Sequence, residues 1–119
     1  HEAASRYCDI CKWLDDENIN VVCCTISFYD DLRARNRANL SNYFEAFVYA
    51  PMDILIKRDV KNLYEPALRG DIQNVVGVDL LLDEPTDPDL RIDNSTDCGD
   101  FTALAEDILR QALKQRAIK

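Results

Sequence analysis

The sequence predicts an α/β protein built on a parallel sheet with flanking helices. Strand-like apolar runs alternate with helical patterns along the 119 residues, a length that fits one domain. The first run, Ile19–Ser27, is apolar or small at almost every position instead of every second one. This unbroken pattern is typical of a strand covered on both faces, and such strands occur mainly in parallel sheets.

The first half of the chain supplies two helices and two strands. Apolar positions spaced three or four residues apart predict a helix at Glu2–Asp16. A charged helix is expected at Asp30–Leu40, with Asp30 suited to the cap position. The second strand, Tyr43–Ala50, stops at Pro51, which cannot donate a ladder hydrogen bond. The expected buried stripe of the first helix consists of Ala4, Tyr7, Cys8, Cys11 and Leu14.

The second half begins with two short helical stretches, Met52–Arg58 and Val60–Leu68. A third strand is expected at Leu90–Asp93. The last helix, Asp100–Ile118, has the clearest pattern, because its apolar residues recur at helical spacing and its basic last turn suits the helix dipole. Strands separated by helices in this way form parallel sheets with right-handed crossovers.

Ligands of such sheets bind beyond the carboxyl ends of the strands. This rule directs attention to Ser27 and Phe28 after the first strand, Pro51 after the second, and Asn94 and Ser95 after the third.

The charge balance excludes a general nucleic-acid binder, since 14 Lys and Arg against 22 Asp and Glu give a net charge of -8. The longest uncharged run, Asn18–Tyr29, is shorter than the ~20 apolar residues of a membrane span, and no charged-then-apolar leader opens the chain. We therefore expect a cytoplasmic protein with no membrane partner. Bases gather at residues 33–37 and 57–61, where they form either a solvated face or an anion site.

The five cysteines predict reduced thiols in a reducing cytosol, because their number is odd and they occupy apolar positions. Cys8 and Cys11 form a CxxC one helical turn apart. No second CxxC or HxxxH supplies further ligands, so we interpret the pair as small buried hydrophobes, with a zinc or redox role as the alternative. No metal site is predicted.

The three glycines, Gly70, Gly77 and Gly99, lie outside any GxxxxGK[ST] or GxGxxG pattern, so the 119 residues contain no phosphate-cradling loop. The single histidine is terminal, which leaves no Ser-His-Asp set. The residues alone indicate an α/β domain with basic groups near its strand ends.

Four motifs sharpen this interpretation: Ala-Pro at 50–51, Lys-Arg-Asp-Val-Lys-Asn-Leu-Tyr at 57–64, Gly-Val-Asp at 77–79 and Glu-Pro at 84–85. Together they resemble the C-terminal part of adenylylsulfate kinases, which phosphorylate adenosine 5'-phosphosulfate with ATP. The likeness runs from about Ala4 to Asn94. It implies a partial P-loop-kinase-like sheet, with residues 1–119 as a single domain and a lid region at about 57–80.

The resemblance implies roles for two basic residues. Lys61 corresponds to the catalytic lid lysine that faces the phosphosulfate, with a solvated helix lysine as the alternative. Arg58 corresponds to a basic residue near the nucleotide phosphates. Its alternative is a simple surface pair with Asp53 or Asp59.

The resemblance also implies a substrate site. Ser27 and Phe28 correspond to the strand-end segment that lines the adenylylsulfate site, and Asn74, Val75 and Gly77 belong to the loop that closes on the adenine. The sequence departs from the family at Val75, because many members have a Phe that stacks on the base there.

The implied ligands are adenylylsulfate, ATP and Mg²⁺, and the implied product is 3'-phosphoadenylylsulfate for sulfate assimilation. Because the P-loop is missing, we expect this chain alone to be inactive. The alternatives are a non-catalytic interaction or dimerisation module, which leaves a homodimer open, and a kinase for another small metabolite.

A structural consequence follows from the resemblance. The strand that leads into the P-loop lies between the strands expected here at 20–27 and 43–50. We therefore expect those two strands to run parallel about two ladder spacings apart, ~9 to 10 Å, without direct hydrogen bonds.

Overall fold

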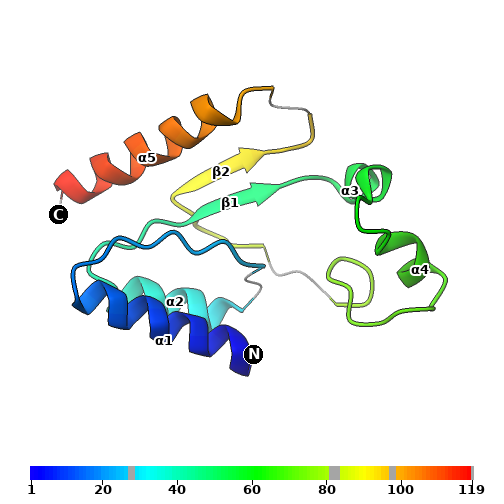
Figure 1. The fold of residues 1–119 in the computed structure, drawn as a ribbon, viewed down its shortest axis with the longest axis horizontal. Coiled ribbons are helices and arrows are strands. Elements are labelled where there is room, and N and C mark those ends of the chain that lie inside the picture. The colour runs from blue at the N-terminus through cyan, green and yellow to red at the C-terminus, as the bar shows by residue number, and fades with distance from the viewer. Residues whose placement is uncertain (27–28, 81–83, 97–98, 119) are drawn as a thin grey trace.

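The computed structural model describes residues 1–26, 29–80, 84–96 and 99–118 (Figure 1). Helices and strands alternate as the sequence predicts, and two strands form a sheet. In chain order the elements are α1 (Glu2–Asp16), α2 (Asp30–Asn39), β1 (Ala46–Tyr49), α3 (Met52–Arg58), α4 (Tyr64–Leu68), β2 (Leu90–Asp93) and α5 (Phe101–Ile118).

The sheet is parallel, which confirms the predicted α/β class. Ala46 of β1 lies opposite Leu90 of β2, and Tyr49 lies opposite Asp93. The pairing extends past the strand ends, because the Asn94 N–H donates to the Tyr49 carbonyl at 2.7 Å. In Figure 1, α5 lies beyond β2, the packed pair of α1 and α2 lies beyond β1, and both strands point toward α3.

The strand predicted at Ile19–Ser27 is wrong for its described part. Residues 19–26 have no strand conformation, and 20–26 form no backbone hydrogen bond with any other described residue. A strand needs a partner, and these residues have none, so apolar side chains such as Val22 (92% exposed) and Ile26 (68%) face outward. Because residues 19–26 form no strand, the expected arrangement parallel to β1 at two ladder spacings is not confirmed.

Other boundaries differ for local reasons. β1 covers four residues instead of the eight from Tyr43 to Ala50, because its partner β2 is only four residues long. The N-cap of α2 is Tyr29 and not Asp30. Asp30 is the first residue of the helix, and its carboxylate pairs with Arg33. Asp100 immediately precedes α5, and its carboxylate accepts the Thr102 N–H at 2.9 Å.

The described residues bury few apolar side chains. Leu32, Ala67 and Ile92 are at most 9% exposed, whereas Tyr7 on α1 is 57% exposed, which contradicts its predicted place in a buried stripe. The other four members of that stripe are half-buried. No helix in the described part of the chain has both the length and the apolar character that a membrane span needs.

The four described cysteines are free thiols. Cys8 and Cys11 are half-buried, while Cys23 and Cys24 are exposed, so the interpretation as apolar interior positions fails for the second pair. Burial is the largest of the causes that raise the pKa of the Cys11 thiol to about 11, followed by the neighbouring Cys23 thiol and its hydrogen bond. Cys98 lies outside the described residues.

Candidate active site

The carboxyl ends of β1 and β2 face α3 and the loop at 94–96, and the turn between α3 and α4 and the 74–80 loop lie farther out on the side of α3 (Figure 1). This is the edge of the sheet at which parallel α/β proteins bind ligands. Of the residues that the sequence singled out, Arg58 and the pair Asn94 and Ser95 meet at this edge from separate segments.

Arg58 joins the last turn of α3 to the loop that follows β2. Its Nη1 donates to the Asn94 carbonyl at 2.7 Å, and its Nη2 donates to the Ser95 carbonyl at 3.3 Å. No ion pair links Arg58 to Asp53 or Asp59 among the described residues, so the alternative of a simple surface pair is wrong. A guanidinium has five N–H donors, and these two bonds leave others for a ligand at the same edge.

Lys61 lies in the tight turn at residues 59–63 between α3 and α4. The Asp59 carboxylate accepts the backbone N–H groups of Leu63 at 2.7 Å and Tyr64 at 3.1 Å, which explains why α4 starts at Tyr64 and not at the predicted Val60. The same carboxylate accepts the Glu65 N–H at 3.3 Å. The Lys61 side chain is exposed, and no other described residue forms a hydrogen bond or ion pair with its ammonium.

The electrostatics of this turn favour an ionised carboxylate. Desolvation acts to raise the pKa of Asp59, but the three N–H donors of Leu63, Tyr64 and Glu65 together hold that pKa below its ordinary value. The carboxylate is therefore charged at neutral pH, and the turn keeps its cap throughout the neutral range.

The loop at 74–80 is closed by a second carboxylate. Asp79 accepts the N–H groups of Asn74 at 2.7 Å and Val75 at 2.6 Å, and these bonds hold the pKa of Asp79 below its ordinary value. The Gly77 N–H donates to the Leu80 carbonyl at 2.8 Å. Val75 is half-buried, and Asn74 is exposed at a positive φ of 65°.

Gly77 places this loop against α3. Its φ is +86°, which suits glycine, and a Cβ at this position would lie 3.1 Å from the Sδ of Met52, the first residue of α3. The structure thus brings the 74–80 loop to one end of α3 and Arg58 to the other. It shows no hydrogen bond or ion pair between Lys61 and the described loop, and Ser27 and Phe28 lie outside the described residues.

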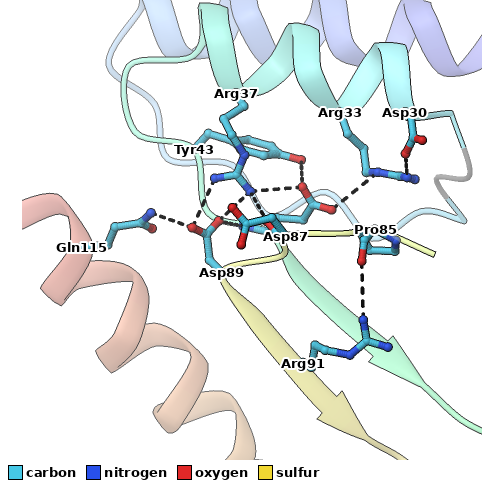
Figure 2. A network of polar contacts seen from close by, with 10 residues as sticks. Asp30, Arg33, Arg37, Tyr43, Pro85, Asp87, Asp89, Arg91 and Gln115 are labelled. Carbon is cyan, nitrogen blue, oxygen red and sulfur yellow. Dashed lines mark hydrogen bonds and ion pairs between the residues drawn. The ribbon is translucent and has the colours of Figure 1, made fainter. Parts of the chain in front are cut away.

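A polar network that the sequence did not predict lies at the opposite, amino end of the strands (Figure 2). Asp89 precedes β2 and pairs with Arg37 of α2 at 3.1 Å. Asp89 also accepts the Glu45 N–H and the Gln115 side-chain amide, each at 2.7 Å. The Glu45 carboxylate in turn pairs with Arg37 and accepts a hydrogen bond from the Tyr43 hydroxyl.

This network has a structural role, because it ties α2 and α5 to the starts of both strands, away from the ligand-binding edge. The basic cluster at 33–37 is held by acidic residues. Arg33 is 7% exposed and pairs with Asp30 and Glu45, and Arg35 pairs with Asp9 at 2.9 Å. Arg33 is therefore no part of a solvated face, whereas Arg37 is exposed and paired.

Comparison with known proteins adds the family. The sequence model of the adenylylsulphate kinase family matches residues 1–93. The chain belongs to the adenylylsulfate kinase family. This assignment confirms the resemblance carried by the motifs at 50–51, 57–64, 77–79 and 84–85.

Relatives within this kinase family differ in substrate. The chain is 40% identical over 94 residues to a cytidine diphosphoramidate kinase of Campylobacter jejuni, a match covering 79% of the chain and 55% of the relative. It is 35% identical over 101 residues to a probable adenylyl-sulfate kinase of Pyrococcus abyssi, covering 85% and 57%. An adenylyl-sulfate kinase of Lactiplantibacillus plantarum is 35% identical over 96 residues, covering 79% and 46%. The chain thus spans about half the length of these relatives.

The family implies ATP as the phosphate donor. The described residues of this kinase-family chain contain no group of three or more His, Cys, Asp and Glu side chains placed to hold a cation. We assign none of the described residues to Mg²⁺.

Proposed function

We propose that the full-length protein carrying this chain transfers the γ-phosphoryl group of ATP to the 3'-hydroxyl of adenylylsulfate in the cytoplasm, as a step of sulfate assimilation. The acceptor oxygen forms a bond to the γ-phosphorus, the bond to the β,γ-bridging oxygen breaks, and ADP leaves. The observation that carries the proposal is the place of Arg58 at the carboxyl end of a parallel sheet in a chain of this family. Lys61 lies in the turn that follows Arg58, and the 74–80 loop lies against the start of α3.

Lys61 is the proposed catalytic residue. Phosphoryl transfer depends on positioning and on neutralising the negative charge around the transferred group. An ammonium without a described partner is available for that charge, and lysine binds phosphate as a compact point charge. We propose that Lys61 faces the phosphosulfate and the transferred phosphoryl group, where it stabilises the transition state.

Arg58 is the proposed nucleotide-binding residue. Its two bonds to the carbonyls of Asn94 and Ser95 fix the guanidinium at the end of β2. The donors that remain can meet phosphate oxygens, which accept such charge-assisted bonds well. We assign the substrate-binding roles to Ser27, Phe28, Asn74, Val75 and Gly77 as the resemblance implies.

A kinase for a different nucleotide-linked metabolite is the second candidate. Two observations favour it: the 40% identity to a cytidine diphosphoramidate kinase, and the aliphatic Val75 at the position where many family members stack a Phe on adenine. A valine offers no aromatic face to a purine, so it reduces the preference for adenine over a pyrimidine.

The test compares substrates. The purified full-length protein is given ATP with adenylylsulfate or with cytidine diphosphoramidate, and kcat/KM is measured for each by ADP release. A higher kcat/KM for adenylylsulfate supports the first candidate, and a higher value for the cytidine compound supports the second. If neither substrate led to ADP release, both candidate functions would be contradicted and the non-catalytic module would be favoured. We also propose that the 119 residues alone give no turnover above a vector-only preparation, since they contain no phosphate-binding loop.

A further inference from the structure

The turn at 59–63 fixes where the Lys61 side chain begins. Asn62 adopts a positive φ of 50°, a conformation that asparagine tolerates but does not strongly favour. Its N–H donates to the Asp59 carbonyl at 2.8 Å. The backbone of Lys61 is therefore held between a main-chain bond on one side and the side-chain bonds of Asp59 to α4 on the other.

The Lys61 side chain has no such constraint. Since no described residue bonds its ammonium, the reach and direction of that ammonium depend on the backbone from which it projects. Of the side chains described in this turn, the Asp59 carboxylate makes the bonds that close it, to the N–H groups of Leu63, Tyr64 and Glu65.

We infer that Asp59 is a positioning residue for Lys61: its carboxylate closes the turn so that the lysine ammonium projects toward the ligand-binding edge. This inference rests on the proposed role of Lys61. A displacement of about 1 Å at a reacting group can lower a rate by about 100-fold, so a carboxylate that never touches the substrate can still control turnover.

The two oxygens of a carboxylate suit this task because they accept three N–H bonds here. Alanine accepts none, while asparagine keeps one acceptor oxygen and remains a good helix cap. Asp100 provides a matched control, because its carboxylate caps α5 through the N–H groups of Thr102 and Ala103 and forms no described hydrogen bond or ion pair with Arg58, Lys61 or the 74–80 loop.

The experiment is a double-mutant cycle in the full-length protein, with kcat and KM measured on whichever substrate the wild type prefers. We expect Asp59→Ala to lower kcat by about tenfold or more, and Asp59→Asn to recover part of that loss. In the Lys61→Ala background, Asp59→Ala should lower kcat by less than about twofold, because it acts through a lysine that is absent. Asp100→Ala should leave kcat within about twofold of the wild type, since it removes only a cap.

Three results would overturn the inference. Equal losses from Asp59→Ala with and without Lys61 would mean that Asp59 acts independently of the lysine. A loss from Asp100→Ala as large as that from Asp59→Ala would mean that cap removal alone explains the effect. Full activity of Lys61→Ala would remove the proposed role of Lys61 itself, which distinguishes failure of the function from failure of the positioning.

Amide hydrogen exchange keeps the inference testable if Asp59→Ala fails to fold. In the Asp59→Asn protein, exchange at Leu63 and Tyr64 should quicken together with the fall in kcat. Unchanged protection at both amides, with kcat lowered, would show that the turn does not transmit the effect.

Discussion

The Arg58 guanidinium donates a 2.7 Å hydrogen bond to the carbonyl of Asn94, and so joins the end of α3 to the loop after β2. The two residues are 36 positions apart in the sequence. This contact holds a basic side chain at the carboxyl edge of the sheet, where we propose that the nucleotide phosphates bind.

Replacing Arg58 tests this placement. Arg58→Ala should raise KM for ATP by about tenfold or more, because charge-assisted bonds to phosphate are lost. Arg58→Lys should recover little, since one ammonium does not reproduce a planar fork that bonds two carbonyls and a ligand. Initial rates at varied ATP measure both effects. The control is Arg69→Ala, which removes an exposed pair with Asp71; an equal rise in KM in this control would refute the assignment.

Gly77 tests the contact between the 74–80 loop and α3. Gly70 and Gly77 both have positive φ, +82° and +86°, but an added Cβ meets nothing within 4 Å at Gly70 and lies 3.1 Å from Met52 at Gly77. Alanine at either position should cost about 1 to 2 kcal/mol of unfolding free energy from backbone strain. Gly77→Ala should cost more, because the Met52 side chain must also give way. Urea unfolding measures the difference, and equal costs would show that the Met52 contact is not tight.

Asp89 tests the network at the amino end of the sheet. The Asp89 side chain is 14% exposed, and Asp89→Ala removes the acceptor of the Glu45 N–H and the Gln115 amide and one of the two acidic partners of Arg37. It should cost about 2 kcal/mol of unfolding free energy. Asp31→Ala, which removes an exposed pair with His1, should cost less than about 1 kcal/mol. Denaturant unfolding measures the unfolding free energy of both variants. Similar losses in the two variants would mean that the network adds little to the stability of the fold.

The same residue sets a pH dependence. Burial acts to raise the pKa of Asp89, but the bonds from Arg37, Glu45 and Gln115 outweigh it and hold that pKa below the ordinary 3.8. An acid with a depressed folded-state pKa stabilises the fold above its unfolded-state pKa, and this contribution is lost as the pH falls through the folded-state value. The stability gap between wild type and Asp89→Ala should therefore be constant near neutrality and narrow below about pH 4.

The thiols test the packing of α1. Because the pKa of Cys11 is raised to about 11, its reactive thiolate is scarce at pH 8. Iodoacetamide should label the exposed Cys24 well before Cys11 in native protein, and the labelling of Cys11 should quicken as the pH rises toward 11. Peptide mapping by mass spectrometry follows both sites. Equal rates at pH 8, or a disulfide between two of these cysteines in native protein, would contradict this description of α1.

Sequence patterns predicted the local elements well, and failed where distant partners decide the structure. The helices at Glu2–Asp16 and Met52–Arg58 have the predicted bounds, because helical spacing and a preceding proline act within a few residues. The strand at Ile19–Ser27 failed because a strand also needs a neighbour, and its described residues have none. Composition cannot supply that information.

The same distinction applies to the site. The 57–64 motif singled out Arg58 and Lys61, and the family match covers both residues, whose roles stay predictions. The motif gave no sign that Arg58 contacts Asn94, nor that the Asp59 carboxylate caps α4. The Arg37–Asp89 pair was missed because 52 residues separate its partners. Acidic residues directly before both strands, Glu45 and Asp89, are the signal that could have indicated it.

The central claim is that Lys61 acts on the transferred phosphoryl group, and one comparison tests it most directly. Turnover of the full-length protein is measured for Lys61→Ala and for Lys114→Ala, an exposed lysine on α5, with the substrate that the wild type prefers. We predict that Lys61→Ala lowers kcat by about 100-fold or more, because it removes charge stabilisation in the transition state, while Lys114→Ala stays within about twofold of the wild type. Equal effects of the two substitutions on kcat would contradict the claim.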